Sequence, residues 1–317
     1  MRSIDAATVN AHLNPARLVA RLKEAFRGET NVPLRHHHNI PGTPENQDAT
    51  LLLMPAWSGE TPPGYIGIKS VTVHPDNPGR GLDSVQGVYL LLDGATGTPV
   101  ALIDGPALTA RRTAAASALA ASFLARTDAQ RLLVIGTGRL APELVRAHAA
   151  VRPIRQVEIW GRNPVRSKAL ADELTSDSLE VSAVTNLEAA VQTADIVSCA
   201  TTSHDPVFEG AWLPPGCHVD LVGGFRPDMR EADDTAIARA RVFVDTLEGA
   251  TREAGDIVQP VESGVLDPAN IAADLFALCR AEHGGRESAE EITLFKSVGT
   301  AIEDLAAAEL LIVELAP

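Results

Sequence analysis

Residues Leu132–Ala141 read LLVIGTGRLA, an apolar, strand-like run that passes through two glycines into a helix-forming segment. This is the G-x-G-x-x-A spacing of dinucleotide-binding turns. In such a turn Gly136 permits the tight bend, Gly138 lets a pyrophosphate approach backbone N–H groups, and Ala141 lets helix and strand pack closely. We predict that a dinucleotide binds at Gly136, Thr137, Gly138, Arg139 and Leu140. On the motif alone, a plain glycine turn between a strand and a helix is the alternative.

A second strand-like run, Gln156–Trp160, follows the predicted helix and completes the strand–turn–helix–strand unit that the motif requires. NAD-binding sites place an acidic residue after this strand to bind the ribose 2′-hydroxyl, whereas this chain has Gly161, Arg162 and Asn163. A cation at this place favours a 2′-phosphate. We therefore predict cofactor contacts from Arg162 and Asn163 and a preference for NADP, with NAD possible. The alternative for Arg162 is a solvated loop residue.

Length and composition limit the class of protein. The 317 residues exceed what one hydrophobic core usually supports, so we expect two domains. No uncharged apolar run approaches a membrane span, and Met1–Asp5 lacks the apolar core of a signal peptide, which predicts a cytoplasmic protein without membrane contact. The net charge of −14 argues against a nucleic-acid partner. Cys199, Cys217 and Cys279 show no metal or redox spacing, which is typical of core thiols.

The chain divides into three parts. The first part has a helix-like segment at Pro15–Phe26 and strand-like runs without a βαβ rhythm, at Ala49–Met54, Tyr65–Val73, Gln86–Leu92 and Pro99–Ile103. From about Arg131 to Val244, short β-branched runs (Val181–Val184, Ile196–Ala200, His218–Val222, Val242–Val244) alternate with helical stretches (Leu187–Gln192, Ala236–Ala240). This alternation predicts an α/β fold with a doubly wound parallel sheet. The third part runs through 271–280 to a helix at Ile302–Leu315, which is apolar on nearly all sides and must be covered by the first domain or by a partner subunit.

Four stretches resemble the ornithine cyclodeaminase/μ-crystallin family: Tyr65–Val71 (YIGIKSV), Leu108–Ala115 (LTARRTAA), Val222–Glu231 (VGGFRPDMRE) and Leu294–Asp304 (LFKSVGTAIED). The resemblance implies a Rossmann-type domain inserted into a discontinuous α+β substrate-binding and dimerisation domain. The implied boundaries are 1–124 for the first part of that domain, 125–295 for the dinucleotide domain, and 296–317 for a C-terminal helix that returns to the first domain. It also implies a homodimer that acts on the C=N bonds of imino acids.

The resemblance implies a carboxylate clamp made by Arg35 and Arg112, because the guanidinium group binds a planar carboxylate with two hydrogen bonds. Arg111 and Arg112 point about 100° apart on a helix, so only one of them is expected to line the site. Two surface charges are the alternative from the residues alone. The family pattern further implies cofactor contacts from Thr113, Ala200, Thr201, Thr202, Val222, Gly223, Lys296 and Gly299.

Lys69 lies in an apolar strand-like run. A buried lysine needs an anionic partner or a lowered pKa, which suits a proton donor or a carboxylate ligand. In a half-exposed strand it would point to water, but the resemblance favours the functional reading and makes Lys69 the catalytic candidate. His36–His38 invites a metal hypothesis, yet consecutive residues of an extended chain alternate faces. We expect a solvent-exposed or substrate-flanking loop there and assign no metal.

Phe225 marks a departure within the family. Ornithine cyclodeaminases have a sequence similar to V-G-x-D here, and their Asp acts on the substrate amine. Asp228 of this chain lies three residues after Phe225 and does not correspond to that Asp. The version of this segment with an aromatic residue resembles ketimine reductases and Δ1-pyrroline-2-carboxylate reductases. The resemblance makes Phe225 a substrate-binding candidate. The expected activity is NAD(P)H-dependent reduction of a small cyclic imino acid, Δ1-pyrroline-2-carboxylate to L-proline first and Δ1-piperideine-2-carboxylate to L-pipecolate second. Ornithine cyclodeaminase or alanine dehydrogenase activity, or a non-catalytic binding protein for NADPH and a small ligand, are the alternatives.

Overall fold

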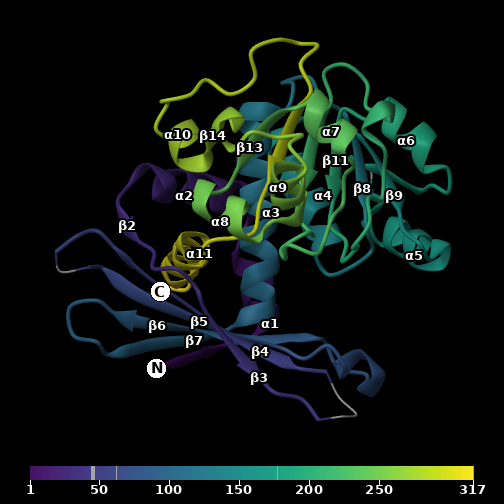
Figure 1. Ribbon diagram of the computed structural model, residues 1–317. Coiled ribbons are helices and arrows are strands. Elements are labelled where there is room, and N and C mark those ends of the chain that lie inside the picture. Colours follow the sequence, from purple (N-terminus) through teal and green to yellow (C-terminus); the bar gives the residue numbers. More distant parts are fainter. Residues whose placement is uncertain (44–46, 62, 177, 317) are drawn as a thin grey trace. The chain divides into compact units, whose positions relative to one another are not determined.

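The computed structural model describes residues 1–43, 47–61, 63–176 and 178–316, and it divides into two compact units. Unit 1 comprises Met1–Arg112 and Thr300–Pro317, and unit 2 comprises Thr113–Gly299 (Figure 1). The first division falls inside helix α3 (Gly105–Leu124), whereas the resemblance placed it at the end of that helix. The C-terminal segment belongs to unit 1 together with the N-terminal residues, so unit 1 is discontinuous in sequence.

Unit 1 is built on a mixed sheet with the strand order β1-β7-β6-β5-β4-β2, and β3 pairs with β4 beside this path. Among the described strands of this sheet, β1 and β7 pair in parallel and the other pairs are antiparallel. The elements are β1 (Arg2–Ile4), α1 (Ala6–His12), α2 (Pro15–Arg27), β2 (Thr30–Asn31), β3 (His36–Ile40), β4 (Ala49–Ser58), β5 (Tyr65–Val73), the short 3-10 helix η1 (Asn77–Arg80), β6 (Val85–Asp93), β7 (Pro99–Asp104), the start of α3 and α11 (Ala301–Glu314).

Helix α11 is the predicted C-terminal helix that is apolar on nearly all sides, and it lies on β4 and β5 with α2 packed beside it (Figure 1). Its residues from Ala301 to Ala308 are all buried, as are Leu310 and Leu311. The sheet meets it with the alternate positions Met54, Lys69 and Tyr89, which lie opposite one another on neighbouring strands. Helix α11 thus belongs to the same compact unit as the N-terminal residues, and Lys69 faces it.

Unit 2 contains an entirely parallel sheet with the strand order β10-β9-β8-β11-β12-β15-β13-β14. The predicted doubly wound α/β fold is confirmed. After the end of α3, the elements are β8 (Arg131–Ile135), α4 (Leu140–Val151), β9 (Gln156–Trp160), α5 (Pro164–Leu174), β10 (Glu180–Ala183), α6 (Leu187–Thr193), β11 (Ile196–Cys199), η2 (Gly210–Trp212), β12 (His218–Leu221), α7 (Asp234–Arg239), β13 (Arg241–Val244), α8 (Leu247–Glu253), α9 (Gly255–Glu262), η3 (Pro268–Asn270), β14 (Ala273–Asp274), α10 (Leu275–Cys279) and β15 (Thr293–Lys296).

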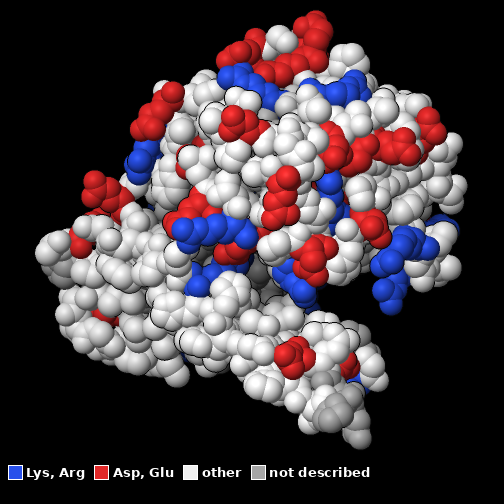
Figure 2. Space-filling model, in the orientation of Figure 1, with Lys and Arg blue, Asp and Glu red and all other residues white. Residues whose placement is uncertain are grey.

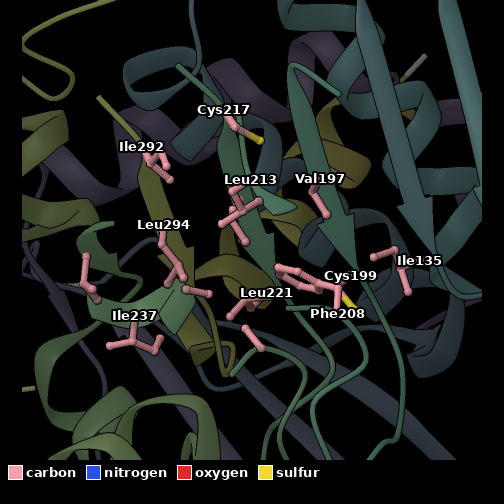
Figure 3. Packing of buried hydrophobic residues seen from close by; sticks show 14 of the residues in the cluster. Ile135, Val197, Cys199, Phe208, Leu213, Cys217, Leu221, Ile237, Ile292 and Leu294 are labelled. Atoms are coloured by element: carbon pink, nitrogen blue, oxygen red, sulfur yellow. The ribbon is translucent and has the colours of Figure 1, made fainter. Parts of the chain in front are cut away.

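Helices cover both faces of this sheet because its strands are apolar on both sides. On one face, Ile135, Val197, Leu221 and Leu294 of four strands pack against residues that include Ile237 of α7 (Figure 3). On the other face, the alternate strand positions pack against α3, α4 and α5. All three cysteines are buried and free, so the prediction of core thiols is confirmed.

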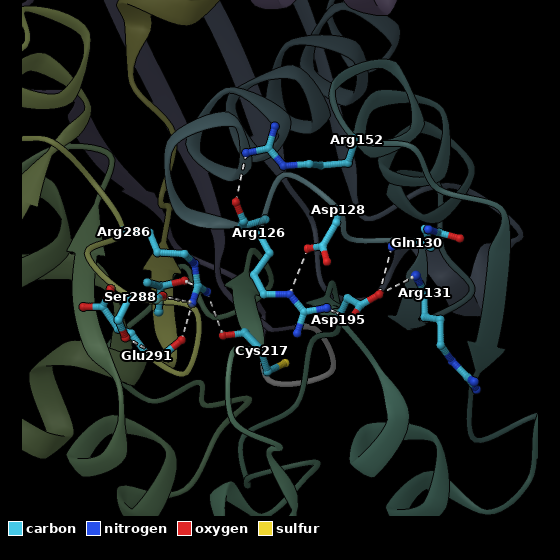
Figure 4. A network of polar contacts seen from close by, with 12 residues as sticks. Arg126, Asp128, Gln130, Arg131, Arg152, Asp195, Cys217, Arg286, Ser288 and Glu291 are labelled. Carbon is cyan, nitrogen blue, oxygen red and sulfur yellow. Dashed lines mark hydrogen bonds and ion pairs between the residues drawn. The ribbon is translucent and has the colours of Figure 1, made fainter.

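The amino-terminal edge of the unit 2 sheet is occupied by a network of arginines (Figure 4). Arg126 Nη2 lies 2.7 Å from Asp195 Oδ1, and Asp195 Oδ2 accepts hydrogen bonds from two backbone N–H groups at the start of β8. Arg152 and Arg286 donate to carbonyl oxygens in the last turn of α3 and just after it. The polar groups at this edge are thus used to hold α3 to the sheet, and the opposite edge, where the strands end, is the expected ligand side.

His36, His37 and His38 were expected in a loop, and that expectation is wrong. They lie in strand β3, which pairs with residues 49–53 of β4, and all three side chains are exposed. An exposed edge strand has no alternation of buried and polar residues, so sequence periodicity could not reveal it. Among the described residues, no group of three or more His, Cys, Asp or Glu side chains could hold a metal ion. No helix within the described ranges is long and apolar enough to cross a membrane.

Candidate active site

The glycine-rich turn has the geometry that its spacing predicts. Gly136 has a φ of +126°, and an added Cβ would lie 2.5 Å from the carbonyl oxygen of Ala200, so a side chain cannot be accommodated. Helix α4 begins directly after the turn, and its N-cap residue Arg139 makes no side-chain capping bond. Among the described residues, nothing lies within 4 Å of a Cβ added at Gly138. An uncapped helix start beside open space at a glycine fits a pyrophosphate group.

The end of β9 lies beside this turn. Gly136 N donates to Trp160 O at 2.8 Å, and a Cβ at Gly161 would lie 2.7 Å from Thr137 Cγ2. The next residue, Arg162, is exposed. Asn163 is also exposed, and its Oδ1 accepts hydrogen bonds from two N–H groups of α5. Arg162 is therefore near the predicted phosphate turn, and Asn163 has a second, structural use as a helix cap.

The remaining predicted cofactor residues of unit 2 lie at the carboxyl ends of neighbouring strands. Ala200, Thr201 and Thr202 follow β11, whereas Val222 and Gly223 follow β12, which pairs with β11 in parallel. Gly299 N and Val298 N, after β15, donate to Asp245 Oδ2 at 2.7 and 2.8 Å. Lys296 differs from this group because its side chain is completely buried, with Nζ 3.0 Å from Asp256 Oδ2. Its observed partner is a carboxylate of the protein.

Unit 1 contains a buried charge cluster around Lys69. Lys69 Nζ lies 2.7 Å from Asp304 Oδ2, and the whole Lys69 residue is only 3% exposed. Arg112 Nε donates to Asp304 Oδ1 at 2.9 Å, and Arg112 Nη1 donates to Glu303 Oε2 at 2.6 Å. Strand β5 and helices α3 and α11 each contribute to the cluster. Lys69 is therefore buried with an anionic partner and does not point to water.

The charges of this cluster shift one another's titration. Burial, and then the positive charge of Arg112, lowers the pKa of Lys69 to about 8, against the opposite pull of Asp304; Arg35 lowers it further. Burial disfavours the charged form of Asp304, but Arg112 and Lys69 together hold its pKa below the usual value. Burial would likewise lower the pKa of Arg112, and Asp304 and Glu303 raise it. Two further cations, Arg112 and Arg35, therefore act on Lys69 beside the carboxylates of Asp304 and Glu303, and this arrangement suits an additional anion.

The two adjacent arginines point to different partners, as helical geometry requires. Arg111 is partly exposed and donates to the side-chain and backbone oxygens of Asn10. Arg112 is buried in the cluster. Phe225, after β12, is 39% exposed, and Asp228 is exposed with Oδ2 2.9 Å from Arg226 Nη2. Asp228 is thus an ordinary surface ion-pair partner in the structure.

Two pairs of acidic residues at these sites were not identified from the sequence. Glu303 and Asp304 hold Arg112 and Lys69, while Glu231 and Asp256 bind loops at the carboxyl edge of unit 2. A signal was present for the first pair, since adjacent carboxylates in a helix apolar on nearly all sides must meet buried cations. The second pair carries no comparable signal, because its partners are mostly backbone N–H groups.

The fold belongs to a recognisable class of two-unit proteins. A doubly wound unit of the dinucleotide-binding type is inserted into a discontinuous α+β unit. The chain belongs to the ornithine cyclodeaminase/mu-crystallin family, because the sequence model of that family matches residues 3–315. The predicted family is confirmed.

Named relatives make the likeness more specific. The chain is 41% identical to a Δ1-pyrroline-2-carboxylate reductase of Colwellia psychrerythraea over 100% of both chains. Its structure resembles that of the Thermococcus litoralis Δ1-pyrroline-2-carboxylate reductase in complex with NADH and L-proline, with a TM-score of 0.92, 34% identity, and coverage of 99% of this chain and 97% of that one. It also resembles an archaeal alanine dehydrogenase dimer with bound NAD, with a TM-score of 0.89, 29% identity, and coverage of 99% and 95%.

Proposed function

We propose that the protein is an NAD(P)H-dependent reductase of cyclic ketimine carboxylates, with Δ1-pyrroline-2-carboxylate to L-proline as the main reaction and Δ1-piperideine-2-carboxylate to L-pipecolate as a second. The observation that carries the proposal is the buried cluster of Lys69 and Arg112 around Asp304. It offers fixed cations to a carboxylate and a titratable ammonium group to an imine nitrogen. The names of the relatives agree with this chemistry.

Each residue has a separate task in this mechanism. Arg112 and Arg35 bind the substrate carboxylate and thereby fix which face of the imine carbon is presented, so that positioning supplies much of the rate. Lys69 stabilises the carboxylate or donates a proton to the imine nitrogen, which makes the carbon a better hydride acceptor. The nicotinamide cofactor supplies the hydride when bound at the glycine turn. Phe225 provides an apolar wall for the ring. The ring nitrogen needs no carboxylate to capture it, which accounts for an aromatic residue where cyclodeaminases have Asp.

A panel of substrates tests this function. Purified protein should oxidise NADPH or NADH with pyrroline or piperideine carboxylate, and only weakly with pyruvate plus ammonia. It should release no ammonia from ornithine in the presence of NAD. Conversion of ornithine to proline with ammonia release would assign a cyclodeaminase, a faster reaction with pyruvate and ammonia would assign an alanine dehydrogenase, and dinucleotide binding without turnover of any substrate would assign a binding protein.

The choice of NADP over NAD rests on Arg162, which is exposed beside the glycine turn with no acidic residue in its neighbouring positions. Arg162→Ala should raise the KM for NADPH by about 10- to 150-fold and leave the KM for NADH nearly unchanged, since a hydrogen bond to a charged group contributes about 1.5–3 kcal/mol. Steady-state kinetics with both cofactors measures this. Equal changes for the two cofactors would remove Arg162 from the 2′-phosphate site.

We also propose that a second copy of the chain covers the free face of the unit 1 sheet. Ile68, Leu90 and Leu102 lie side by side on β5, β6 and β7, on the face away from α11, and are only half-buried. The strand region of unit 1 is largely uncharged on the face seen in Figure 2, whereas charged residues gather over unit 2. Apolar side chains that lie side by side and half-buried on an open sheet face, as Ile68, Leu90 and Leu102 do, are typical of an interface.

Light scattering should give the mass of a dimer for the native protein and of a monomer for Leu90→Lys. Val165→Lys is the matched control, because Val165 is an apolar residue 77% exposed on α5 of unit 2 and should leave the mass unchanged. A monomeric native protein, or a dimer that survives Leu90→Lys, would contradict the proposal.

A further inference from the structure

Glu231 is completely buried at the carboxyl edge of the unit 2 sheet and binds two separate loops. Its Oε1 accepts hydrogen bonds from Thr201 N at 2.6 Å and Thr201 Oγ1 at 2.9 Å, and its Oε2 accepts one from Gly223 N at 2.7 Å. Thr201 follows β11 and Gly223 follows β12, which are neighbours in the sheet. One carboxylate therefore joins the turns after two adjacent parallel strands.

These two turns are in direct contact. A Cβ added at Gly223 would lie 1.9 Å from Thr201 O and 2.5 Å from Glu231 Oε1, so any side chain there would push the turns apart. Ligands of doubly wound folds bind outside the carboxyl ends of the strands, which is where these turns lie. Their relative position decides the shape of that edge.

A third strand is tied to the same network through Asp256, in the first turn of α9. Asp256 Oδ1 accepts hydrogen bonds from Glu231 N at 2.8 Å and Ala232 N at 3.2 Å. Its Oδ2 lies 3.0 Å from Lys296 Nζ, at the end of β15, which pairs with β12. Glu231, Asp256 and Lys296 are all 0% exposed. The ends of β11, β12 and β15 are thereby held by one continuous set of buried contacts.

We propose that Glu231 is a positioning residue of the cofactor site: its carboxylate, held by Asp256 and Lys296, sets the Thr201 and Gly223 turns at the separation that the nicotinamide end of the dinucleotide requires. The inference rests on the proposed function, because it needs a dinucleotide at this edge. Lys296, predicted from the sequence to contact the cofactor, would act through Asp256 and Glu231.

The protonation of Glu231 provides a way to switch this network. Burial raises the pKa of Glu231 to about 7, with Lys296 lowering and Asp256 raising it; the Cys199 thiol also faces it and has its own pKa raised by burial and by Glu231. A protonated carboxyl group presents an O–H where an N–H now donates, so one of the turns loses its acceptor. Cofactor affinity should therefore be full above pH 7 and fall as the pH drops through that value.

Stability should change with pH in the opposite direction. The pKa of Glu231 is raised in the folded protein from 4.5 to about 7, so the folded state binds more protons than the unfolded chain between these values. Its contribution to the free energy of unfolding is largest below about pH 4.5 and falls as the pH rises towards 7. A purely structural role predicts only this stability effect, whereas a positioning role predicts weaker cofactor binding at low pH.

The test compares Glu231→Gln with Asp220→Asn. Asp220 is the matched control because it is a fully buried carboxylate of β12 that accepts one hydrogen bond from Ser198 and contacts His148, which are not residues of the two turns. The dissociation constant of freshly mixed NADH is measured by fluorescence from pH 6 to 8.5, with the melting temperature recorded for each protein. NADH is used because it lacks a 2′-phosphate that would itself titrate.

In Glu231→Gln the dissociation constant and KM for NADH should rise at least about 10-fold at pH 8 and lose their dependence on pH, while the KM for the imine changes less than about 3-fold. Asp220→Asn should melt earlier but keep the native affinity and pH profile. Native-like NADH binding in Glu231→Gln, or an equal loss in Asp220→Asn, overturns the inference. If Glu231→Gln does not fold, the native protein decides, since an affinity that is flat from pH 6 to 8 also overturns it. Failure of the native protein to bind NADH and NADPH alike would instead refute the proposed function.

Discussion

Lys69→Met is expected to lower kcat/KM for Δ1-pyrroline-2-carboxylate by about 100- to 10,000-fold, the range typical for loss of a positioned general acid. The physical reason is the position of the ammonium group, which is buried with Nζ 2.7 Å from Asp304 Oδ2 and shares that carboxylate with Arg112. Methionine fills a similar volume but carries neither a proton nor a charge. Steady-state kinetics measures the loss, and native cofactor binding shows that the variant is folded.

The pH profile separates the two roles that the mechanism leaves open for Lys69. Because burial and Arg112 lower its pKa to about 8, a proton donor is fully charged below pH 7 and loses its proton as the pH rises through 8. The native kcat/KM should fall along this limb. In Lys69→Arg the charge persists at every accessible pH. If Lys69 only binds the substrate carboxylate, Lys69→Arg should keep partial activity, and its kcat/KM should not fall as the pH rises through 8. If Lys69 is the proton donor, Lys69→Arg should lose as much activity as Lys69→Met. Native activity in both variants would exclude Lys69 from the mechanism.

Local patterns were sufficient to predict much of the fold. The expected bounds of β5 and β9 match the structure, whereas α2 ends one residue later than expected and α11 begins and ends one residue earlier. These elements carry their own signals: a run of β-branched residues beside glycines, or the Asn14-Pro15 pair at the start of a helix, where Asn14 caps the first turn. Strand β3 carries no such signal, since its exposed residues become a strand only by pairing with β4.

The buried charge networks could not be predicted because their partners are distant in sequence. Arg112 and Asp304 are separated by 192 positions, and Glu231 and Asp256 by 25. Sequence chemistry indicates that a buried lysine needs an anion, but it does not say which of the 41 acidic residues supplies it. The fold makes that choice by placing α11 over β5. The family pattern located Lys69 and Arg112, and the structure adds the carboxylates that hold them.

Arg112→Lys tests whether the guanidinium group itself, and not only its charge, is required at the carboxylate clamp. Arg112 donates from Nε to Asp304 and from Nη1 to Glu303, so a substrate carboxylate must be bound by other N–H groups of the same planar guanidinium. One ammonium group cannot serve two buried carboxylates and a substrate in fixed geometry. Leaving part of this charge unpaired should cost about 2–4 kcal/mol, a drop in kcat/KM on the order of 30- to 1,000-fold.

Arg111→Lys is the matched control, because Arg111 is the adjacent cation of the same helix, is partly exposed, and donates hydrogen bonds to Asn10. It should change kcat/KM less than about 3-fold, as expected for an exposed charge. Cofactor binding, followed through Trp160 beside the glycine turn, should survive in both variants. A larger loss in Arg111→Lys would exchange the roles of the two arginines. If Arg112→Lys lowers only the melting temperature and leaves kcat/KM intact, Arg112 serves to neutralise Asp304 and Glu303, and the substrate carboxylate must be bound by other cations.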